Sequence, residues 1–392
     1  MNIGILTRES RNYSSTRLKE AAIQRGHKVK FYNTMKFAID VEKNKPCLFY
    51  DDKIVKNVDA IIPRIGASIT FFGTAVVRQF EQMGTYCQNP SLGITISRDK
   101  LRAIQVLSRH DLGIPKTVFV KDKKLIMSSM KQIHDNDPVV IKLLEGTQGI
   151  GVILADTKKV AEAIIETLQS TKQNVLIQEF VRESKGKDIR AFVVGGKVVG
   201  AMRRTAQGDE FRSNVHRGGT VEAINLDPEY EETAIRAAQI MGLNVAGVDM
   251  LESKTGPKIM EVNSSPGLEG IEAATQKDIA GCIIEHLEKQ VLFPDIDIRQ
   301  KLTLSSHYSV AEIPIDRNSR LHNTTIESSK LREDDIVVLS LIRGKIAIAN
   351  PKNTRQILAG DKLICFGHND TMRNLIPKKE KKKKKKQNEE QS

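Results

Sequence analysis

The first ninety residues alternate short apolar runs with segments in which apolar residues recur every three or four positions. The apolar runs at 3–6, 29–32 and 60–62 have the length of strands, and the segments 18–24 and 76–83 have the spacing of helices. Strands that alternate with helices are the usual components of a parallel sheet. The pattern therefore predicts a small parallel α/β layer at the start of the chain.

A second stretch, from about residue 95 to 290, has a different order of elements. It begins with a helix that carries Lys100 and continues with strands at 139–143, 151–154 and 175–181. Two pairs of strands follow, and short turns join the members of each pair. These pairs are predicted to be hairpins, whose register can be worked out from their turns.

In the first hairpin, Gly195 and Gly196 supply the positive φ angles that a two-residue turn requires. Residues whose numbers sum to 391 would then face one another. This register predicts that Asp188 lies opposite Arg203.

The second hairpin carries a group of oxygen ligands. A turn centred near Thr255 places Asp249 opposite Glu261, and Asn263 shares their face because strand side chains repeat every two residues. Such ligands suit Mg²⁺, and two ions could share Glu261 as a bridge. The alternative is an exposed acidic face of a sheet. We disfavour it because Asp249 and Glu261 stand in apolar runs, where unpaired acids are costly to bury.

A lysine and a glycine-rich segment suggest a phosphate site. Lys142 ends an apolar strand and is followed by 145–151, where Gly149 and two further glycines would let backbone N–H groups approach phosphates. No Gly-Lys-Ser/Thr follows, and 152–154 continues as a strand, so neither a Walker A loop nor a dinucleotide fingerprint is present. Without the lysine, a plain hairpin would be the better interpretation.

Basic residues gather just before the second hairpin. They are Arg190, Arg203, Arg204, Arg212, His216 and Arg217. Each alone fits a surface charge, but their density indicates anion binding. The loop residues Arg212, Ser213 and Asn214 could border a transferring phosphate. We take Arg203, Arg212 and Asn214 as candidate catalytic residues.

Five motifs resemble the ATP-grasp ligases of the RimK type, which add glutamate to the C-terminus of the sixth small-subunit ribosomal protein. The motifs occupy residues 62–66, 98–100, 145–152, 211–219 and 260–270. The resemblance covers residues 1 to about 290. It implies a parallel α/β pre-ATP-grasp domain followed by an ATP-grasp fold of two α+β lobes.

The resemblance also implies roles for individual residues. The nucleotide would be bound by Lys100, Lys142, Gly149, Glu179, Phe180, Asp188, Arg212, Ser213 and Asn214, with Glu179 and Phe180 at the adenine hinge. Asp249, Glu261 and Asn263 would hold two Mg²⁺ or Mn²⁺ ions. The chemistry would be phosphorylation of an acceptor carboxylate by ATP, followed by attack of the glutamate amine.

The last third of the chain reads as a separate α+β domain. Strands are predicted at 310–315, 336–342, 346–349 and 362–366, with turn signals at glycines between them. Residues 308–376 resemble the TrkA-C domain of potassium-channel regulators and transporters. Such a domain could bind a small effector or form a homo-oligomer.

These patterns predict five segments. They are a pre-ATP-grasp domain at 1–94, an ATP-grasp domain at 95–290, a linker at 291–307, a TrkA-C-like domain at 308–376 and a disordered polylysine tail at 377–392. The fold class is therefore α/β and α+β.

Charge and cysteine content add little to this assignment. The formal net charge is +13, of which the tail from Lys378 contributes +5 through eight Lys and three Glu. The tail could contact RNA or the ribosome, or it could simply be solvated. Four separated cysteines indicate neither disulfides nor a zinc site. We expect no membrane span and a cytoplasmic location.

The expected function is an ADP-forming ligase that glutamylates the C-terminal carboxylate of a ribosomal small-subunit protein through an acyl phosphate. Two alternatives stay open. The acceptor could be a small molecule or a carrier protein, or the chain could be a nucleotide-sensing regulator without catalysis.

Overall fold

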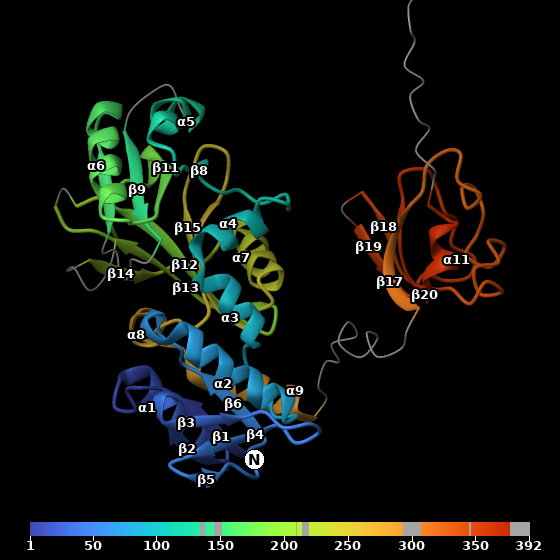
Figure 1. Ribbon diagram of the computed structural model, residues 1–392, viewed down its shortest axis with the longest axis horizontal. Coiled ribbons are helices and arrows are strands. Elements are labelled where there is room, and N and C mark those ends of the chain that lie inside the picture. The colour runs from blue at the N-terminus through green and yellow to red at the C-terminus, as the bar shows by residue number, and fades with distance from the viewer. Residues whose placement is uncertain are drawn as a thin grey trace, which may run out of the picture. The chain divides into compact units, whose positions relative to one another are not determined.

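The computed structural model describes residues 1–133, 138–144, 151–208, 210–213, 219–292, 307–344 and 346–376. The chain divides into two compact units, Met1–Pro294 and Asp295–Ser392 (Figure 1). Each unit has a hydrophobic core of its own. Within the described ranges, no helix is both long and apolar enough to cross a membrane.

The first unit begins with the parallel sheet that the alternating pattern predicts. Its strands are β1 (Asn2–Leu6), β2 (Lys28–Tyr32), β6 (Ala60–Pro63) and β7 (Tyr86–Cys87), in the order β2-β1-β6-β7. Its helices are α1 (Tyr13–Gln24) and α2 (Thr70–Gln82). Both helices begin earlier than predicted. The predicted starts follow apolar spacing, whereas α1 begins at a polar turn in which the Asn12 side chain accepts a hydrogen bond from the Ser15 backbone N–H.

A three-stranded antiparallel sheet interrupts this domain and was not predicted. Its strands are β3 (Phe37–Asp40), β4 (Cys47–Tyr50) and β5 (Lys53–Ile54). Phe37 and Leu48 from this sheet are buried together with Phe80 of α2. The small sheet thus extends the core beneath α2.

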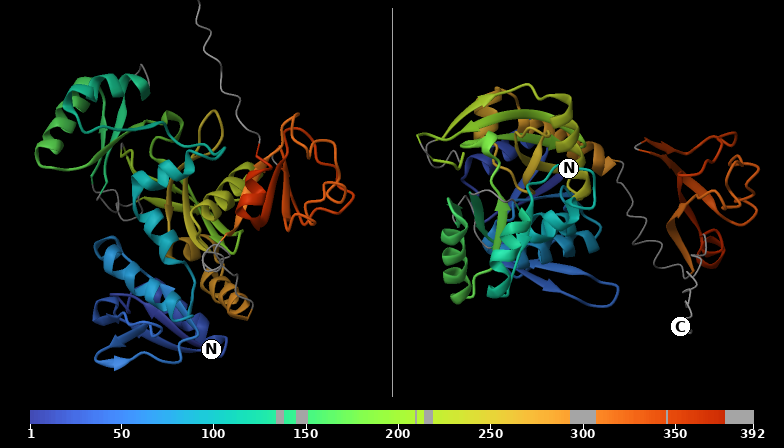
Figure 2. Two further views of the ribbon diagram at one scale, coloured as in Figure 1. Left: turned by 45° about the vertical axis from the view of Figure 1, so that its right-hand side comes forward. Right: turned by 90° about the horizontal axis from the view of Figure 1, so that it is seen from above.

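The next lobe is an antiparallel sheet with two helices. Its strands are β8 (Thr117–Phe119), β9 (Val139–Leu143), β10 (Val152–Ala155) and β11 (Val175–Glu179), in the order β10-β9-β11-β8. Helices α5 (Ile126–Ile133) and α6 (Lys158–Ser170) pack on one face of this sheet (Figures 1 and 2). Every buried residue of this core comes from the lobe itself.

The following lobe is a five-stranded antiparallel sheet covered on both faces. Its strands are β12 (Lys187–Val194), β13 (Lys197–Thr205), β14 (Thr220–Ala223), β15 (Val245–Leu251) and β16 (Lys258–Asn263), in the order β14-β13-β12-β15-β16. The helices that contribute to this lobe are α3 (Ser91–Arg98), α4 (Lys100–Leu107), α7 (Pro228–Ile240), α8 (Glu269–Thr275) and α9 (Ile279–Leu292). Residues of α4 and α7 form one core with this sheet, and residues of α8 and α9 form another.

The second of these cores joins the five-stranded sheet to the N-terminal domain. Ile3, Ile5 and Leu18 belong to the same buried cluster as Phe192 of β12 and Ile283 of α9. The N-terminal domain and the five-stranded lobe therefore share apolar packing.

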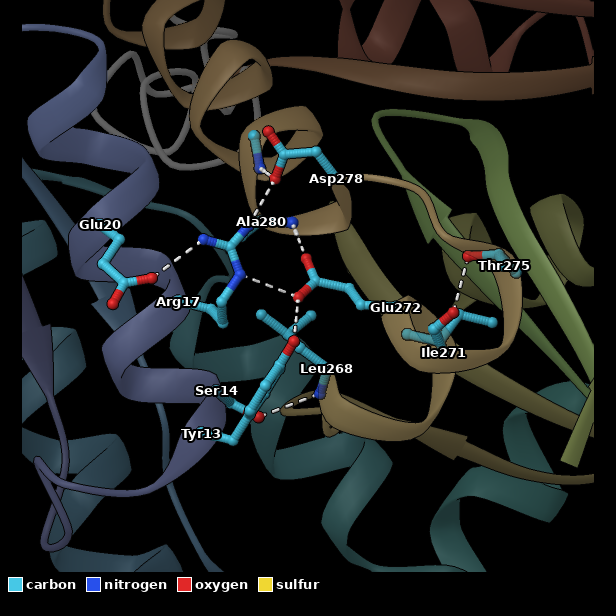
Figure 3. A network of polar contacts seen from close by, with 11 residues as sticks. Tyr13, Ser14, Arg17, Glu20, Leu268, Ile271, Glu272, Thr275, Asp278 and Ala280 are labelled. Carbon is cyan, nitrogen blue, oxygen red and sulfur yellow. Dashed lines mark hydrogen bonds and ion pairs between the residues drawn. The ribbon is translucent and has the colours of Figure 1, made fainter. Parts of the chain in front are cut away.

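A polar network fastens α1 to the segment around α8 and α9 (Figure 3). Glu272 accepts hydrogen bonds from the Tyr13 hydroxyl at 3.0 Å, from Arg17 Nε at 3.1 Å and from the Ala280 backbone N–H at 2.9 Å. Arg17 Nη2 also binds Asp278 at 2.9 Å. Glu272 is only 8% exposed, and these hydrogen bonds to both of its carboxylate oxygens offset the cost of burying the charge.

The second unit is a four-stranded antiparallel sheet. Its strands are β17 (Tyr308–Pro314), β18 (Val337–Arg343), β19 (Ile346–Ala349) and β20 (Lys362–His368), in the order β17-β20-β18-β19, and α11 (Asn369–Arg373) follows. These strands lie within three residues of the predicted ones. Ile313, Leu341 and Leu363 lie in its core.

Candidate active site

The two hairpins confirm one predicted register and correct the other. Asp249 of β15 lies opposite Glu261 of β16, and Asn263 lies two residues further along the same strand, as predicted. In the β12–β13 hairpin, however, Asp188 lies opposite Arg204 and not Arg203.

A β-bulge causes this error. Next to the Gly195-Gly196 turn, Val193 pairs with Val198 as the turn predicts, but Phe192 pairs with Gly200. The extra residue moves every later pair by one position, and a shift of one residue moves a strand side chain to the other face.

The bulge brings Arg204 into the site and takes Arg203 away from it. Arg203 forms ion pairs with Glu222 at 3.2 Å and Glu252 at 3.0 Å. Arg204 instead donates from Nε to Asp188 at 2.6 Å and from Nη2 to Asp249 at 2.8 Å. The structure therefore does not support Arg203 as part of this cluster.

Asp188, Arg190, Arg204 and Asp249 form a buried charge network. Arg190 binds both Asp249 oxygens at 2.7 Å, and the Ser213 hydroxyl donates to Asp188. Burial opposes ionisation of Asp249, but the two guanidinium groups outweigh burial and hold its pKa below the usual range. Burial raises the pKa of Asp188 despite Arg204. Burial also opposes the charge of Arg204, yet Asp249 and Asp188 raise its pKa above the ordinary value.

The predicted metal ligands are therefore in different environments. Both oxygens of Asp249 bind arginine, whereas the side chain of Glu261 is exposed. Asn263 Nδ2 is buried and has no hydrogen-bond partner within the described segments. Among the described residues, no three His, Cys, Asp or Glu side chains gather in a metal-binding group. Glu261 and Asn263 fit a hard cation that needs oxygen donors, and Asp249 would share its carboxylate between such a cation and the two arginines.

Two lysines on different elements, Lys100 of α4 and Lys142 of β9, interact electrostatically with Glu261. Lys100, at the start of α4, donates from Nζ to the Leu143 carbonyl at 2.9 Å. Burial lowers the pKa of Lys142 to about 8. The negative charge of Glu261 opposes this change, whereas the positive charge of Lys100 lowers the pKa further. Burial also lowers the pKa of Lys100, again opposed by Glu261. The charge of Glu261 thus favours the protonated form of both lysines.

The predicted hinge residues lie at the end of β11. Glu179 forms an ion pair with Lys258 at 2.9 Å and accepts a hydrogen bond from the Lys116 backbone N–H at 3.1 Å. Phe180 follows directly and is half-buried. Sequence reasoning missed Lys258, because a contact between β11 and β16 has no local signal in the chain.

Arg212 connects the loop after β13 with the first lobe. It donates from Nε and Nη2 to Glu210 at 2.9 and 2.8 Å, and from Nη1 to the Val152 carbonyl at 3.3 Å. The hydrogen bonds to Glu210 raise the pKa of Arg212. The predicted site residues Gly149 and Asn214, like most of the glycine-rich segment, lie outside the described residues.

Comparison with protein families identifies three regions. A model described as the RimK PreATP-grasp domain matches residues 1–94, one described as the RimK-like ATP-grasp domain matches residues 97–287, and the TrkA-C domain matches residues 310–378. The last match accounts for the second unit.

Close relatives carry one name. A protein of Rhodopirellula baltica named probable alpha-L-glutamate ligase is 60% identical over 97% of this chain and 93% of its own length. A protein of the same name from Marinomonas sp. is 56% identical over 74% of this chain and 96% of its own.

Solved structures show the same fold at low identity. The ATP-grasp ligase PsnB, bound to a minimal precursor, Mg and ADP, has a TM-score of 0.58 and 19% identity, and the match covers 74% of this chain and 98% of that one. The D-alanine–D-alanine ligase of Bacillus anthracis, bound to ATP, has a TM-score of 0.55 and 18% identity, with 74% and 97% covered. Together with the relatives above, these matches confirm the predicted fold class and enzyme class: the chain belongs to the RimK-like ATP-grasp ligases, the family of the probable alpha-L-glutamate ligases.

Proposed function

We propose that this ligase joins L-glutamate to the C-terminal carboxylate of a small-subunit ribosomal protein, using ATP and two divalent cations. The name of the relatives supports glutamate as the amine substrate. The observation that carries the proposal is the pairing of Asp249 with Glu261, with Asn263 two residues further along β16, since it places the candidate metal ligands on neighbouring strands. Lys100 Nζ binds the carbonyl of Leu143, the residue after Lys142, and so adds positive charge beside that strand. The acceptor rests on the resemblance to RimK-type ligases.

The proposed reaction has two steps. An oxygen of the acceptor carboxylate attacks the terminal phosphorus of ATP, which releases ADP and leaves an acyl phosphate. The amine of glutamate then attacks the acyl carbon, inorganic phosphate leaves, and the nitrogen loses a proton as the amide forms. Both steps move negative charge among phosphate oxygens, so fixed positive groups stabilise them.

The residues of the chain supply most of that positive charge. Lys142, whose amine is costly to bury, gains a counter-charge when a phosphate arrives, and Lys100 lies beside it. Arg212, in the loop after β13, donates to the Val152 carbonyl at the start of β10 and adds a further positive charge. Asp249, Glu261 and Asn263 would hold Mg²⁺ or Mn²⁺, which would offset phosphate charge.

The remaining parts of the chain have proposed roles in control and localisation. In this proposal the domain limits are those predicted from the sequence, and the enzyme works in the cytoplasm. The TrkA-C domain binds a small effector or forms a homo-oligomer. The lysine tail attracts ribosomal RNA without reading its sequence.

Mass spectrometry tests the acceptor directly. The purified enzyme is incubated with ATP, Mg²⁺, glutamate and a mixture of small-subunit ribosomal proteins, and each protein is then weighed. We expect one protein to gain one or more glutamyl residues, and we expect the gain to need ATP.

A parallel incubation with Glu261→Gln controls for contaminating ligases. If ADP forms but no ribosomal protein gains mass, the acceptor is a small molecule or a carrier protein. If no ADP forms with any acceptor, the enzymatic proposal is wrong and a nucleotide-sensing role is the better explanation.

A further inference from the structure

Two sequence motifs contain arginines to which the proposed reaction gives no role. Arg64 belongs to the motif at 62–66 and follows β6 of the N-terminal domain. Arg98 belongs to the motif at 98–100 and is the last residue of α3. Both lie where the N-terminal domain meets the segment that follows β16.

The protein satisfies few donors of these two guanidinium groups. Within the described residues, Arg64 Nη1 donates to the Pro266 carbonyl at 2.8 Å and Arg98 Nη2 donates to the Ile65 carbonyl. Arg98 Nε is buried and has no partner among the described residues. Each guanidinium has five N–H groups, so most of them lack a protein acceptor within that part of the chain.

Among the residues that the structure describes, neither arginine is matched by a counter-ion of its own. In the described part of the chain, no carboxylate lies within ion-pair distance of Arg64 or Arg98. Burial lowers the pKa of Arg64 to about 10, and repulsion from Arg98 adds to this effect. The pKa of Arg98 is also lowered by burial, with Glu261 as the opposing charge. By contrast, Arg204 binds two carboxylates within 2.8 Å.

Buried cations without a counter-ion are costly and are therefore a sign of a missing anion. The fold holds the pair in place, because Pro266 packs so closely against Gly247 that a Cβ at residue 247 would lie 2.8 Å from it. Asn263, opposite Gly247, adds a second buried and unpartnered donor, Nδ2, near Glu261. The unsatisfied donors are thus beside the proposed reacting centre.

We propose that Arg64 and Arg98 bind a carboxylate of the incoming glutamate, an assignment that rests on the proposed ligase function. The acceptor carboxylate is a reacting group that becomes an acyl phosphate and then an amide. Glutamate brings two carboxylates that stay ionised throughout both steps. A pair of fixed arginines suits such a permanent charge and would also orient the amine toward the acyl carbon.

Steady-state kinetics of Arg98→Met test the assignment. We expect the KM for glutamate to rise about 10- to 100-fold, the range that loss of a charged hydrogen bond gives. The KM values for ATP and acceptor should stay within about threefold, which is below the effect of one such bond. Arg98→Lys keeps the charge without the planar fork and should recover part of the loss. The matched control is Arg102→Met, an exposed arginine one turn further along the chain.

Two analogues identify the carboxylate. Glutamine lacks the γ-carboxylate and isoglutamine lacks the α-carboxylate. The wild-type enzyme should discriminate against the analogue without the bound group, and Arg98→Met and Arg64→Lys should lose that discrimination. Calorimetric titration of glutamate into the full chain, in the presence of ADP and Mg²⁺, compares the glutamate affinity of the wild type and the variants without turnover. Thermal melts verify that each variant is folded.

The outcomes separate this inference from the proposed function. A wild-type enzyme that neither binds glutamate nor makes a glutamyl product contradicts both. If the wild type is active and a folded Arg98→Met protein has an unchanged KM for glutamate, only the arginine assignment is wrong. A rise confined to the KM for ATP or acceptor overturns it equally, because the anion would then be a phosphate or the acceptor.

Discussion

Replacing Lys142 by methionine should stabilise the fold while it abolishes activity. The pKa of this amine falls from 10.5 to about 8, mainly through burial, and a tenfold change in acidity corresponds to about 1.4 kcal/mol. Keeping the amine charged in the empty enzyme therefore costs up to about 3 kcal/mol at neutral pH. Methionine has a similar length and no charge, so Lys142→Met should raise the free energy of unfolding by about 1–3 kcal/mol at pH 7.

The sign of the pH dependence follows from the lowered pKa. Below pH 8 the amine is protonated in both the folded and the unfolded chain, so the cost is fully present. Between about pH 8 and 10.5 the folded protein loses this proton first, and the cost disappears. The advantage of the variant should therefore shrink over this window.

Urea unfolding followed by circular dichroism at pH 7 and pH 10 measures this difference, since the chain has no tryptophan. Exposed Lys159, on α6 of the same lobe, provides the control Lys159→Met, which should change stability little. Nucleotide affinity, measured by titration with ADP and Mg²⁺, should fall in Lys142→Met. A variant that is no more stable than the wild type at pH 7, or whose advantage does not depend on pH, would refute the reasoning.

Four further outcomes are expected. Glu261→Gln should slow ADP release about 100-fold or more without lowering the melting temperature, and near-normal release from the folded variant would remove Glu261 from the metal site. Arg204→Met should cost about 3–5 kcal/mol in chemical unfolding because it removes the guanidinium that two buried carboxylates, Asp188 and Asp249, share, whereas Arg203→Met should cost at most about 1 kcal/mol; equal costs would contradict the observed register. Glu272→Gln should lose about 1–3 kcal/mol of stability, since it removes the charge that binds Arg17, and an unchanged unfolding midpoint would show that this network contributes nothing. A chain that ends at Leu292 should still form ADP with glutamate and acceptor but respond to no effector, and a folded yet inactive truncation would show that the TrkA-C domain completes the active site.

The sequence predicted structure best where a local signal sets the geometry. A turn centred near Thr255 placed Asp249 opposite Glu261 correctly, although the pairs nearer the turn, Leu251–Lys258 and Met250–Ile259, are one residue away from that register and a bulge at Met250 restores it. Apolar alternation located the strands of the TrkA-C domain. The β12–β13 register was wrong because a bulge depends on how both strands pack, and its composition gives no local sign. Gly200, where the ladder shifts, lies close to Ile279 and Ile271 of distant helices.

Partners of buried charges were equally hidden from the sequence. Arg190, Arg204 and Lys258 bind carboxylates 45 to 79 residues away, so only the folded sheets reveal these pairs. Asp249, Glu261 and Asn263 were predicted as metal ligands, but the sequence did not show that two arginines bind Asp249.

The separate core of the lobe formed by β8–β11, α5 and α6 decides where this enzyme can bend. The N-terminal domain and the five-stranded lobe share buried side chains and the Glu272 network, so a hinge between them would break apolar packing and charged hydrogen bonds. The first lobe keeps its core residues to itself. If it rotated over a nucleotide, its core would stay intact while polar contacts such as Lys258–Glu179 and Lys100–Leu143 rearranged. The nucleotide would therefore be enclosed between two bodies. One consists of the N-terminal domain and the five-stranded lobe, which share a core, and the other is the lobe that has a core of its own.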